Sequence, residues 1–227
     1  MIYAVIAAGG IGSRMGADKP KQYIEIGGKA IILHTAEKFI YNACTDKVIV
    51  LVPQDWVDYT KDIFNGTDVI VIPGGDTRNE TLMRAIDYIE DTDGLNEDTY
   101  LLTHDAVRPF VTDDIINANI DALLEYGATG TVIPATDTIF KSENGKVIDS
   151  IPDRAQLYQA QTPQCFKATK LRELYESLSG DEKDILTDGC KIYLLKGEDV
   201  HLVGGHVSNI KITYPHDLIV AEAILKN

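Results

Sequence analysis

The sequence predicts an α/β protein with a doubly wound, mostly parallel sheet. Short runs rich in Val, Ile, Leu and Tyr alternate with longer segments of helical pattern, an order typical of parallel strands joined by crossover helices. Several of the short runs are apolar throughout, as strands covered on both faces are. The expected strands span residues 2–8, 47–52, 69–72, 100–104 and 129–133, and the expected helices span residues 31–40, 54–64, 78–90 and 112–126.

The alternation breaks in the second half of the chain, at residues 137–161. Asn144-Gly145 is a strong signal for a hairpin turn in this segment. A long excursion inside a compact domain is usually functional or an interface element. We therefore expect one domain, residues 1–227, with an inserted β-arm at 137–161 that forms a homodimer. Beyond the arm, the expected elements are helices at 170–177 and 184–195, strands at 201–203 and 210–213, and a last helix from Pro215.

Composition and charge narrow the function classes. The 227 residues are 44% hydrophobic and 25% charged, as in an ordinary globular protein. A formal net charge of −14 without a basic stripe argues against nucleic-acid binding. No apolar run reaches the roughly 18 residues of a membrane span, and three scattered cysteines without a CxxC pair argue against a disulfide framework or a zinc site. We expect a cytoplasmic protein with small-molecule partners, and neither nucleic acid nor membrane.

A glycine-rich, basic loop follows the first expected strand: AAGGIGSRMGADKPKQY, residues 7–23. Glycines let a backbone approach a phosphate and direct its N–H groups at the oxygens. The dinucleotide pattern does not fit, because Gly16 comes one residue too late after Gly10 and Gly12, and the Walker pattern lacks its lysine after Gly16. The loop is either a solvated turn or a cradle for a triphosphate, with charge supplied by Arg14, Lys19 and Lys21.

Five ordered segments resemble the sugar- and polyol-phosphate cytidylyltransferases. The first is the glycine loop with the P-K-Q-Y that follows it. The others are GGDTRNET at 74–81, HDAVRP at 104–109, QTPQ at 161–164, and N-I-K-I-T-x-P-x-D-L at 209–218. The resemblance covers nearly the whole chain. It implies a Rossmann-like, nucleotidyltransferase-type fold, with CTP and a polyol phosphate as substrates.

Two acceptors compete within this family. IPDRAQLYQAQTPQCF at 151–166 and ILTDGCKIY at 185–193 resemble the ribitol-5-phosphate enzymes. We therefore predict transfer of the cytidylyl group of CTP to D-ribitol 5-phosphate, which gives CDP-ribitol and pyrophosphate for teichoic acid or a related polymer. The alternative is the 2-C-methyl-D-erythritol 4-phosphate enzyme of isoprenoid synthesis. From another class, the alternative is a non-catalytic nucleotide-binding sensor.

The expected chemistry depends on charge rather than on a general base. A phosphate monoester is largely dianionic at neutral pH, so its oxygen can attack the α-phosphorus of CTP directly. Because two polyanions must meet, positioning and fixed positive charge are the main catalytic contributions. We predict Arg14 and Lys21 as transition-state stabilisers. The resemblance assigns Arg154 and Lys211 to the phosphate of the acceptor, with Arg154 reaching the partner subunit's site.

Asp105 ends the fourth expected strand, at the edge of the sheet where ligands bind. A carboxylate there is unfavourable beside anionic substrates unless it holds a cation, so we predict that Asp105 binds Mg²⁺. The alternative is a helix cap or an ion pair with Arg108.

The remaining site residues come from the motifs. The predicted CTP contacts are Ala7, Ala8, Gly9, Gly10, Gly12, Gly75, Asp76, Arg78, Asn79, Thr81 and Ala106. The predicted substrate contacts are Arg108, Thr138 and Thr187.

Overall fold

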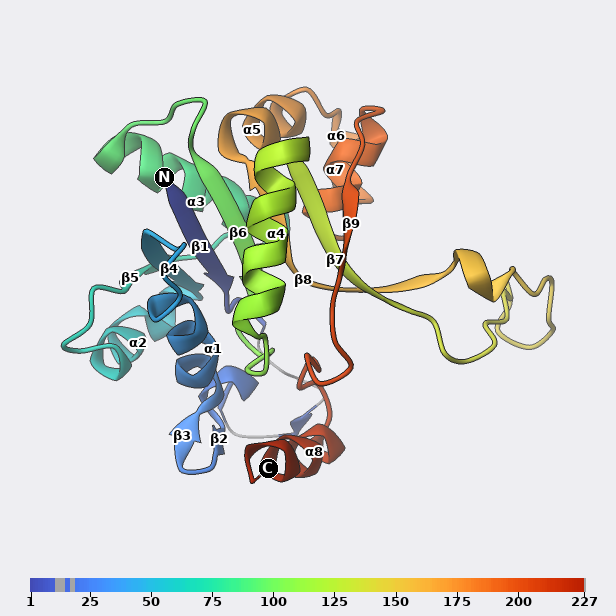
Figure 1. Cartoon of the computed structure of the whole chain (residues 1–227), viewed down its shortest axis with the longest axis horizontal. Coiled ribbons are helices and arrows are strands. Elements are labelled where there is room, and N and C mark those ends of the chain that lie inside the picture. Colours follow the sequence, from blue (N-terminus) through green and yellow to red (C-terminus); the bar gives the residue numbers. More distant parts are fainter. Residues whose placement is uncertain (11–14, 17–18, 227) are drawn as a thin grey trace.

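A central sheet organises the molecule, as the computed structural model shows for residues 1–10, 15–16 and 19–226 (Figure 1). Within these residues the sheet has seven strands: β1 Ile2–Ala7, β4 Lys47–Val52, β5 Ile70–Pro73, β6 Tyr100–Asp105, β7 Ala128–Pro134, β8 Tyr158–Lys167 and β9 His201–Gly204. Their order is β5-β4-β1-β6-β8-β7-β9. β8 is antiparallel to β6 and β7, whereas β1 pairs in parallel with β4 and β6. The predicted mostly parallel sheet is confirmed.

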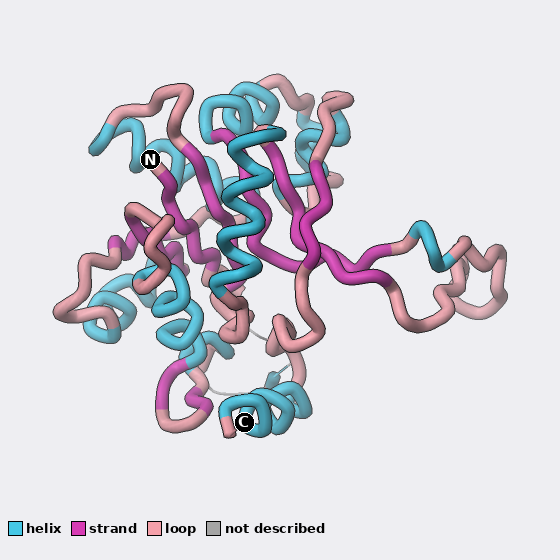
Figure 2. Tube along the Cα trace, viewed as in Figure 1, coloured by secondary structure: helices cyan, strands magenta, loops and turns pink. Residues whose placement is uncertain are grey.

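Helices cover both faces of the sheet (Figure 2). Successive side chains of a strand point to opposite faces, so the apolar strands supply side chains to both layers of helices. In β1, Ala4 and Ile6 pack in one apolar cluster with α1 Ile31–Ile40, α2 Val57–Ile63 and α4 Asp113–Tyr126. Tyr3 and Val5 belong to the opposite cluster, with α3 Arg78–Asp93, α5 Ala168–Glu176 and α7 Gly189–Leu195. None of the described helices combines the length and the apolar character needed to cross a bilayer.

The helix ends follow from local sequence signals. Thr77 and Glu80 form a reciprocal capping box at the start of α3, and the Thr112 side chain caps α4. Gly127 ends α4 at a φ of 83°, a conformation that favours glycine. The predicted helices at 31–40, 78–90 and 112–126 therefore agree with the structure to within a few residues.

Five features of the structure differ from the predicted elements. The helix expected at 54–64 begins with a 3₁₀ turn, Gln54–Trp56, and the helix expected at 184–195 is two helices, α6 Gly180–Asp184 and α7. Residues 210–213 form no strand, because this segment makes single contacts such as Ile212 N to Val107 O at 2.9 Å rather than a ladder. Strand β8 was missed because its polar, proline-containing sequence has no apolar period. The short hairpin of β2 Glu25–Ile26 and β3 Lys29–Ala30 was also missed.

The arm, residues 137–161, leaves the body of the molecule after β7, and its last residues, 158–161, form the start of β8 (Figure 1). At its far end Asn144 Oδ1 accepts from the backbone N–H groups of Lys146 and Val147, and an antiparallel bridge joins Lys141 to Ser150. The turn predicted at Asn144-Gly145 is therefore present. Five large apolar side chains of the arm are exposed: Ile139, Phe140, Val147, Ile148 and Ile151.

The last helix, α8 Pro215–Leu225, lies below the sheet in Figure 1 beside β2 and β3. A small apolar cluster of Ile26, Val107, Ile212 and Ala221 joins it to the body. This cluster fixes the preceding segment, which carries Lys211, against the end of β6.

Candidate active site

A pocket of about 340 Å³ opens at the carboxyl ends of β1 and β6 and at the loop that follows β5. β1 lies at the position where the chain reverses its direction of winding through the sheet, and such switch points are where open α/β sheets bind ligands. The described residues that line the pocket are Ala7, Ala8, Gly9, Gly10, Lys21, Gln22, Gly75, Asp76, Thr77, Arg78, Thr81, Asp105, Ala106, Val107 and Lys211.

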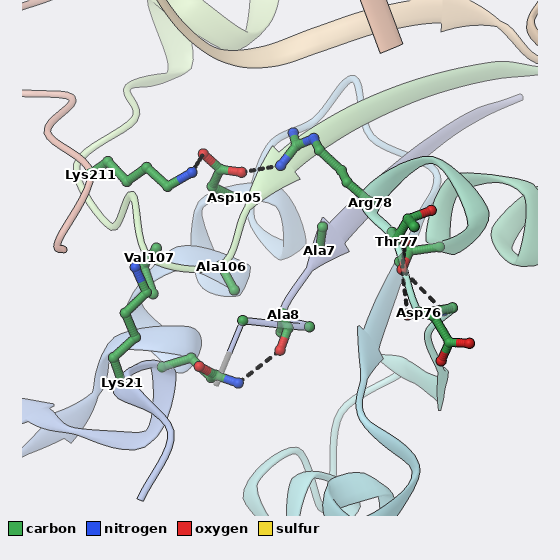
Figure 3. A pocket seen from close by; sticks show the side chains of 15 residues that line it. Ala7, Ala8, Lys21, Asp76, Thr77, Arg78, Asp105, Ala106, Val107 and Lys211 are labelled. Carbon is green, nitrogen blue, oxygen red and sulfur yellow. Dashed lines mark hydrogen bonds and ion pairs between the residues drawn. The ribbon is translucent and has the colours of Figure 1, made fainter. Parts of the chain in front are cut away.

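Lys21 and Gln22 line the larger pocket at the end of the glycine loop, and Figure 3 shows the position of Lys21. The buried amide of Gln22 donates from Nε2 to the carbonyl of Ala8 at 2.7 Å, which fixes the start of the loop. Lys21 Nζ donates to the carbonyl of Ile212 at 3.0 Å. Both belong to a 3₁₀ turn, Lys21–Tyr23, whose Tyr23 ring stacks on Trp56 with centroids 4.7 Å apart. Packing therefore holds these two polar side chains in place.

The opposite wall is the turn between β5 and α3. Gly75 donates its backbone N–H to Thr81 Oγ1 at 3.0 Å, and Asp76 N donates to Glu80 Oε2 at 2.9 Å. A Cβ on Gly75 would lie 2.4 Å from Glu80 Cβ, so this position requires glycine. The exposed Arg84 donates to the carbonyl of Gly74 at 2.7 Å. These hydrogen bonds hold the turn in a fixed shape beside the pocket.

Asp105 is the centre of an ionic cluster (Figure 3). Its Oδ1 pairs with Arg78, while Oδ2 lies 3.0 Å from Lys211 Nζ and 3.2 Å from Arg108 Nε. Burial alone would raise the pKa of the Asp105 carboxyl, but the charges of these neighbours outweigh it and hold the pKa well below its usual range. Desolvation opposes the charge of Arg78 too, yet the pKa of its guanidinium is raised by Asp105. Asp105 is therefore ionised, and three basic side chains surround its single carboxylate.

A second pocket, of about 160 Å³, adjoins this cluster. It shares Arg78, Asp105 and Lys211 with the larger pocket. Its other lining residues are Arg108, Ala160, Gln161, Thr162, Gln164, Thr187 and Asp188. Two cavities of different size thus meet at one group of cations, which suits two anionic ligands that must be brought together.

The structure brings most predicted site residues to these two pockets. Of the predicted CTP contacts, Asn79 is buried on α3 and is not among the described lining residues. Thr138 and Arg154 lie on the arm, where Arg154 Nη1 donates to the carbonyl of Thr136. Arg14 and Gly12 lie outside the described residues.

Sequence reasoning missed several lining residues. Gln22 lies in the P-K-Q-Y segment, and Thr162 and Gln164 lie in Q-T-P-Q. These motifs predict no role for the three residues. Thr77 and Asp188 are helix caps that also face a pocket. The motifs were therefore the available signal, and only the fold shows which of their side chains point into the pockets.

The predicted magnesium ligand can be compared with the donors present. No three His, Cys or acidic side chains of the described residues are grouped so as to hold a metal. Mg²⁺ is, however, often held by one or two carboxylates together with substrate phosphates. Asp105 lies in both pockets and fits this mode as a single protein ligand, although Arg78, Arg108 and Lys211 now pair with its oxygens. Binding of Mg²⁺ stays a prediction.

Comparison with known proteins identifies the family. Residues 2–227 match the family model "IspD: 2-C-methyl-D-erythritol 4-phosphate cytidylyltransferase". A 4-diphosphocytidyl-2C-methyl-D-erythritol synthase from Anaerococcus prevotii is similar in structure, with a TM-score of 0.82, 28% identity, and coverage of 100% of this chain and 96% of that one. The 2-C-methyl-D-erythritol 4-phosphate cytidylyltransferase from Francisella tularensis gives a TM-score of 0.83 and 28% identity, with 98% of each chain covered. That from Thermus thermophilus gives 0.78 and 27%, with 100% of each chain covered. The chain therefore belongs to the IspD family of CTP-using cytidylyltransferases, a family of nucleotidyltransferases.

Proposed function

We propose that this cytidylyltransferase uses 2-C-methyl-D-erythritol 4-phosphate as its acceptor. The observation that supports transfer to a phosphorylated polyol is the pair of pockets that share Arg78, Asp105 and Lys211. The family model and the solved relatives carry the name of the methylerythritol phosphate enzyme. They favour this acceptor over the D-ribitol 5-phosphate expected from the sequence, which is not confirmed.

In this proposal the larger pocket takes CTP. The backbone of residues 7–10 and the charge of Lys21 contact its phosphates, while the turn at Gly75 and Asp76 faces the base. Asp105 would hold Mg²⁺ together with the phosphates, and the ion would supply further positive charge to the α-phosphoryl group. Thr81, which accepts from Gly75 N at 3.0 Å, keeps the turn in the required shape.

The smaller pocket takes the acceptor. Arg108 and Lys211 bind its phosphate, and a guanidinium suits this task because its planar donors match two phosphate oxygens. Thr187 and Asp188 face the polyol hydroxyls. The attacking phosphate oxygen carries its own negative charge at neutral pH, so no residue needs to remove a proton. Catalysis then consists of alignment and of charge stabilisation at the α-phosphorus.

The arm belongs to the same proposal. Its apolar side chains are exposed in the monomer, and the described residues 137–157 contain no strand and one antiparallel bridge, Lys141 to Ser150. Even a complete two-stranded hairpin is only marginally stable alone in water, so this arm needs a partner surface. Two copies therefore associate through residues 137–161, and each arm brings Thr138 and Arg154 to the partner's smaller pocket. A twofold arrangement makes both contacts at once.

Ribitol 5-phosphate remains a second candidate, because residues 151–166 and 185–193 resemble the ribitol enzymes and the second of these segments supplies Thr187 and Asp188 to the smaller pocket. Pyrophosphate release from CTP with Mg²⁺ distinguishes the two acceptors. We expect kcat/KM for methylerythritol phosphate to exceed that for ribitol 5-phosphate by at least tenfold, a difference of about 1.4 kcal/mol that one hydroxyl contact can supply.

The reverse preference would assign the second candidate. No turnover with either acceptor, together with tight CTP binding, would instead support the nucleotide-binding sensor. UTP in place of CTP, and CTP without an acceptor, are the controls.

A further inference from the structure

We propose that His104 is a positioning residue for this reaction, because it and Thr162 tie together both ends of the turn from Asp105 to Arg108. The inference rests on the proposed function for its kinetic part and on geometry alone for its structural part. His104 belongs to the HDAVRP motif, but no role is predicted for it there.

His104 is the penultimate residue of β6 and is completely buried. Its ring packs against Phe39 of α1, with ring centroids 5.0 Å apart. It is not among the described residues that line either pocket. A catalytic role in contact with substrate is therefore not supported, and the chemistry offers His104 no proton to remove.

The hydrogen bonds of the ring have one consistent direction. Nε2 lies 3.1 Å from the carbonyl oxygen of Arg108, which can only accept, so Nε2 carries the hydrogen. Nδ1 lies 2.9 Å from Thr162 Oγ1, and that oxygen accepts from the backbone N–H of Asp105 at 3.1 Å. Thr162 must then donate its hydroxyl hydrogen to Nδ1. This chain of hydrogen bonds runs from the backbone N–H of Asp105 through Thr162 and His104 to the carbonyl of Arg108.

A protonated ring would break this chain. Nδ1 would then be a donor, and Thr162 Oγ1 would face two donors while its own hydrogen lost its acceptor. The hydrogen-bond geometry therefore selects the neutral Nε2–H tautomer.

The consequence concerns the ionic cluster. The turn is closed by Arg108 N donating to Asp105 O at 3.1 Å, and it presents the Asp105 carboxylate and the Arg108 guanidinium side by side. His104 and Thr162 hold the first N–H and the last carbonyl of this turn. Since Arg78 and Lys211 pair with Asp105, a shift of the turn displaces cations in both pockets.

The first test needs no substrate. The ¹⁵N spectrum of histidine-labelled wild-type protein at pH 7.5, with His104 assigned from His104→Asn, should show a protonated Nε2 and an unprotonated Nδ1. The opposite tautomer, or a mixture of both, would overturn the proposal.

The second test measures turnover with whichever acceptor the wild-type enzyme uses. His104→Phe keeps a flat buried ring but removes both hydrogen bonds, and should lower kcat by at least tenfold with KM for CTP changed less than twofold. His104→Gln can keep the donor to Arg108, and His104→Asn can keep the acceptor for Thr162. Each should retain more activity than His104→Phe. His201→Gln, at an exposed position of β9, should behave as wild type.

The melting temperatures of the His104 variants show whether a loss of activity comes from a displaced site or from loss of the fold. A His104→Phe enzyme that stays folded with wild-type kcat would overturn the proposal. If His104→Phe does not fold, Thr162→Val against Thr162→Ser gives the same comparison, since serine restores the hydroxyl link, and equal activity of the two would overturn it. A wild-type protein inactive with both acceptors contradicts the proposed function, while the tautomer result still decides the structural claim.

Discussion

Lys21 Nζ lies 3.0 Å from the carbonyl oxygen of Ile212, a residue 191 positions away in the chain. This hydrogen bond links the glycine loop to the segment that carries Lys211. Lys21 is only 8% exposed, and Ile212 is completely buried in the small cluster under α8. The two lysines that we assign to phosphates are thus held by the same junction between the two ends of the chain.

Replacing Lys21 tests the role of this charge. Lys21→Ala should lower kcat by about 10²–10³ and change KM for CTP much less, because the charge matters most when the α-phosphoryl group is most negative. Steady-state kinetics with varied CTP give both constants. Lys38→Ala, at an exposed position of α1, is the control and should be neutral. A Lys21→Ala enzyme with normal kcat and only a raised KM would contradict the transition-state role.

Gly75 is predicted to tolerate no side chain. An alanine Cβ would lie 2.4 Å from Glu80 Cβ and 2.9 Å from the carbonyl carbon of Glu80, so the turn or the start of α3 must move. We expect Gly75→Ala to lower the free energy of unfolding by roughly 1–3 kcal/mol, the usual cost of overpacking, and to raise KM for CTP.

Gly180→Ala is the matched control for that substitution. Apart from its chain neighbours and the nearby backbone of its own helix, no described atom lies within 4 Å of the position that an alanine Cβ would take there, and Gly180 is the first residue of α6. Its stability should stay within about 0.5 kcal/mol of wild type. Denaturant unfolding measures both variants, and equal stabilities would show that the turn at Gly75 adapts freely.

The buried His104 predicts how stability depends on pH. Its pKa falls from 6.5 to about 4 on folding, because burial disfavours the charged ring. Between these values the unfolded chain binds a proton that the folded chain does not, so the contribution is complete above pH 6.5 and is lost as pH falls towards 4. It amounts to about 3 kcal/mol.

Denaturant unfolding in EDTA at several pH values between 4 and 7 measures this dependence. The free energy of unfolding should fall more steeply with decreasing pH in the wild type than in His104→Asn, which lacks the titrating group. Parallel curves for the two proteins would show that the ring is not held neutral.

The sequence predicted the sheet well where its strands are apolar on both faces. β1 and β4 are such strands, and the helices α3 and α4 carry clear caps at Thr77 and Thr112. β8 could not be found in this way, because it joins the sheet through backbone bonds to β6 and β7 while its residues 158–164 are largely polar. Its place depends on partners that are distant in the chain.

In the candidate site too, some residues could be predicted from the sequence, whereas others depend on contacts with distant parts of the chain. Ala7, Gly75 and Asp105 were predicted because their motifs lie at the end of a strand or just after it, at one edge of the sheet. Gln22 and Thr162 were not assigned, since their importance comes from hydrogen bonds to Ala8 and Asp105 that only the folded chain forms. Motifs therefore located the pockets, whereas the supporting contacts required the structure.

The arm gives the last prediction, that Arg154 acts in the partner subunit's site. Arg154 is not among the described residues that line either pocket of its own chain, and it begins the 3₁₀ turn Arg154–Gln156 on the arm. Arg154→Ala should therefore remove activity although the pockets stay intact. Lys21→Ala should do the same from within the larger pocket. Each variant alone is expected to be nearly inactive in the pyrophosphate-release assay.

Mixing these two variants under conditions that allow subunit exchange separates the two arrangements. If Arg154 acts in trans, a mixed dimer has one site with both residues and one site with neither. In a statistical mixture half of the dimers are mixed, and each of these has one working site of two. Activity should therefore return to about a quarter of wild type. If Arg154 acts within its own subunit, every site keeps one defect and the mixture stays inactive. Differently tagged copies show whether mixed dimers form, and inactive mixed dimers would rule out the in-trans role.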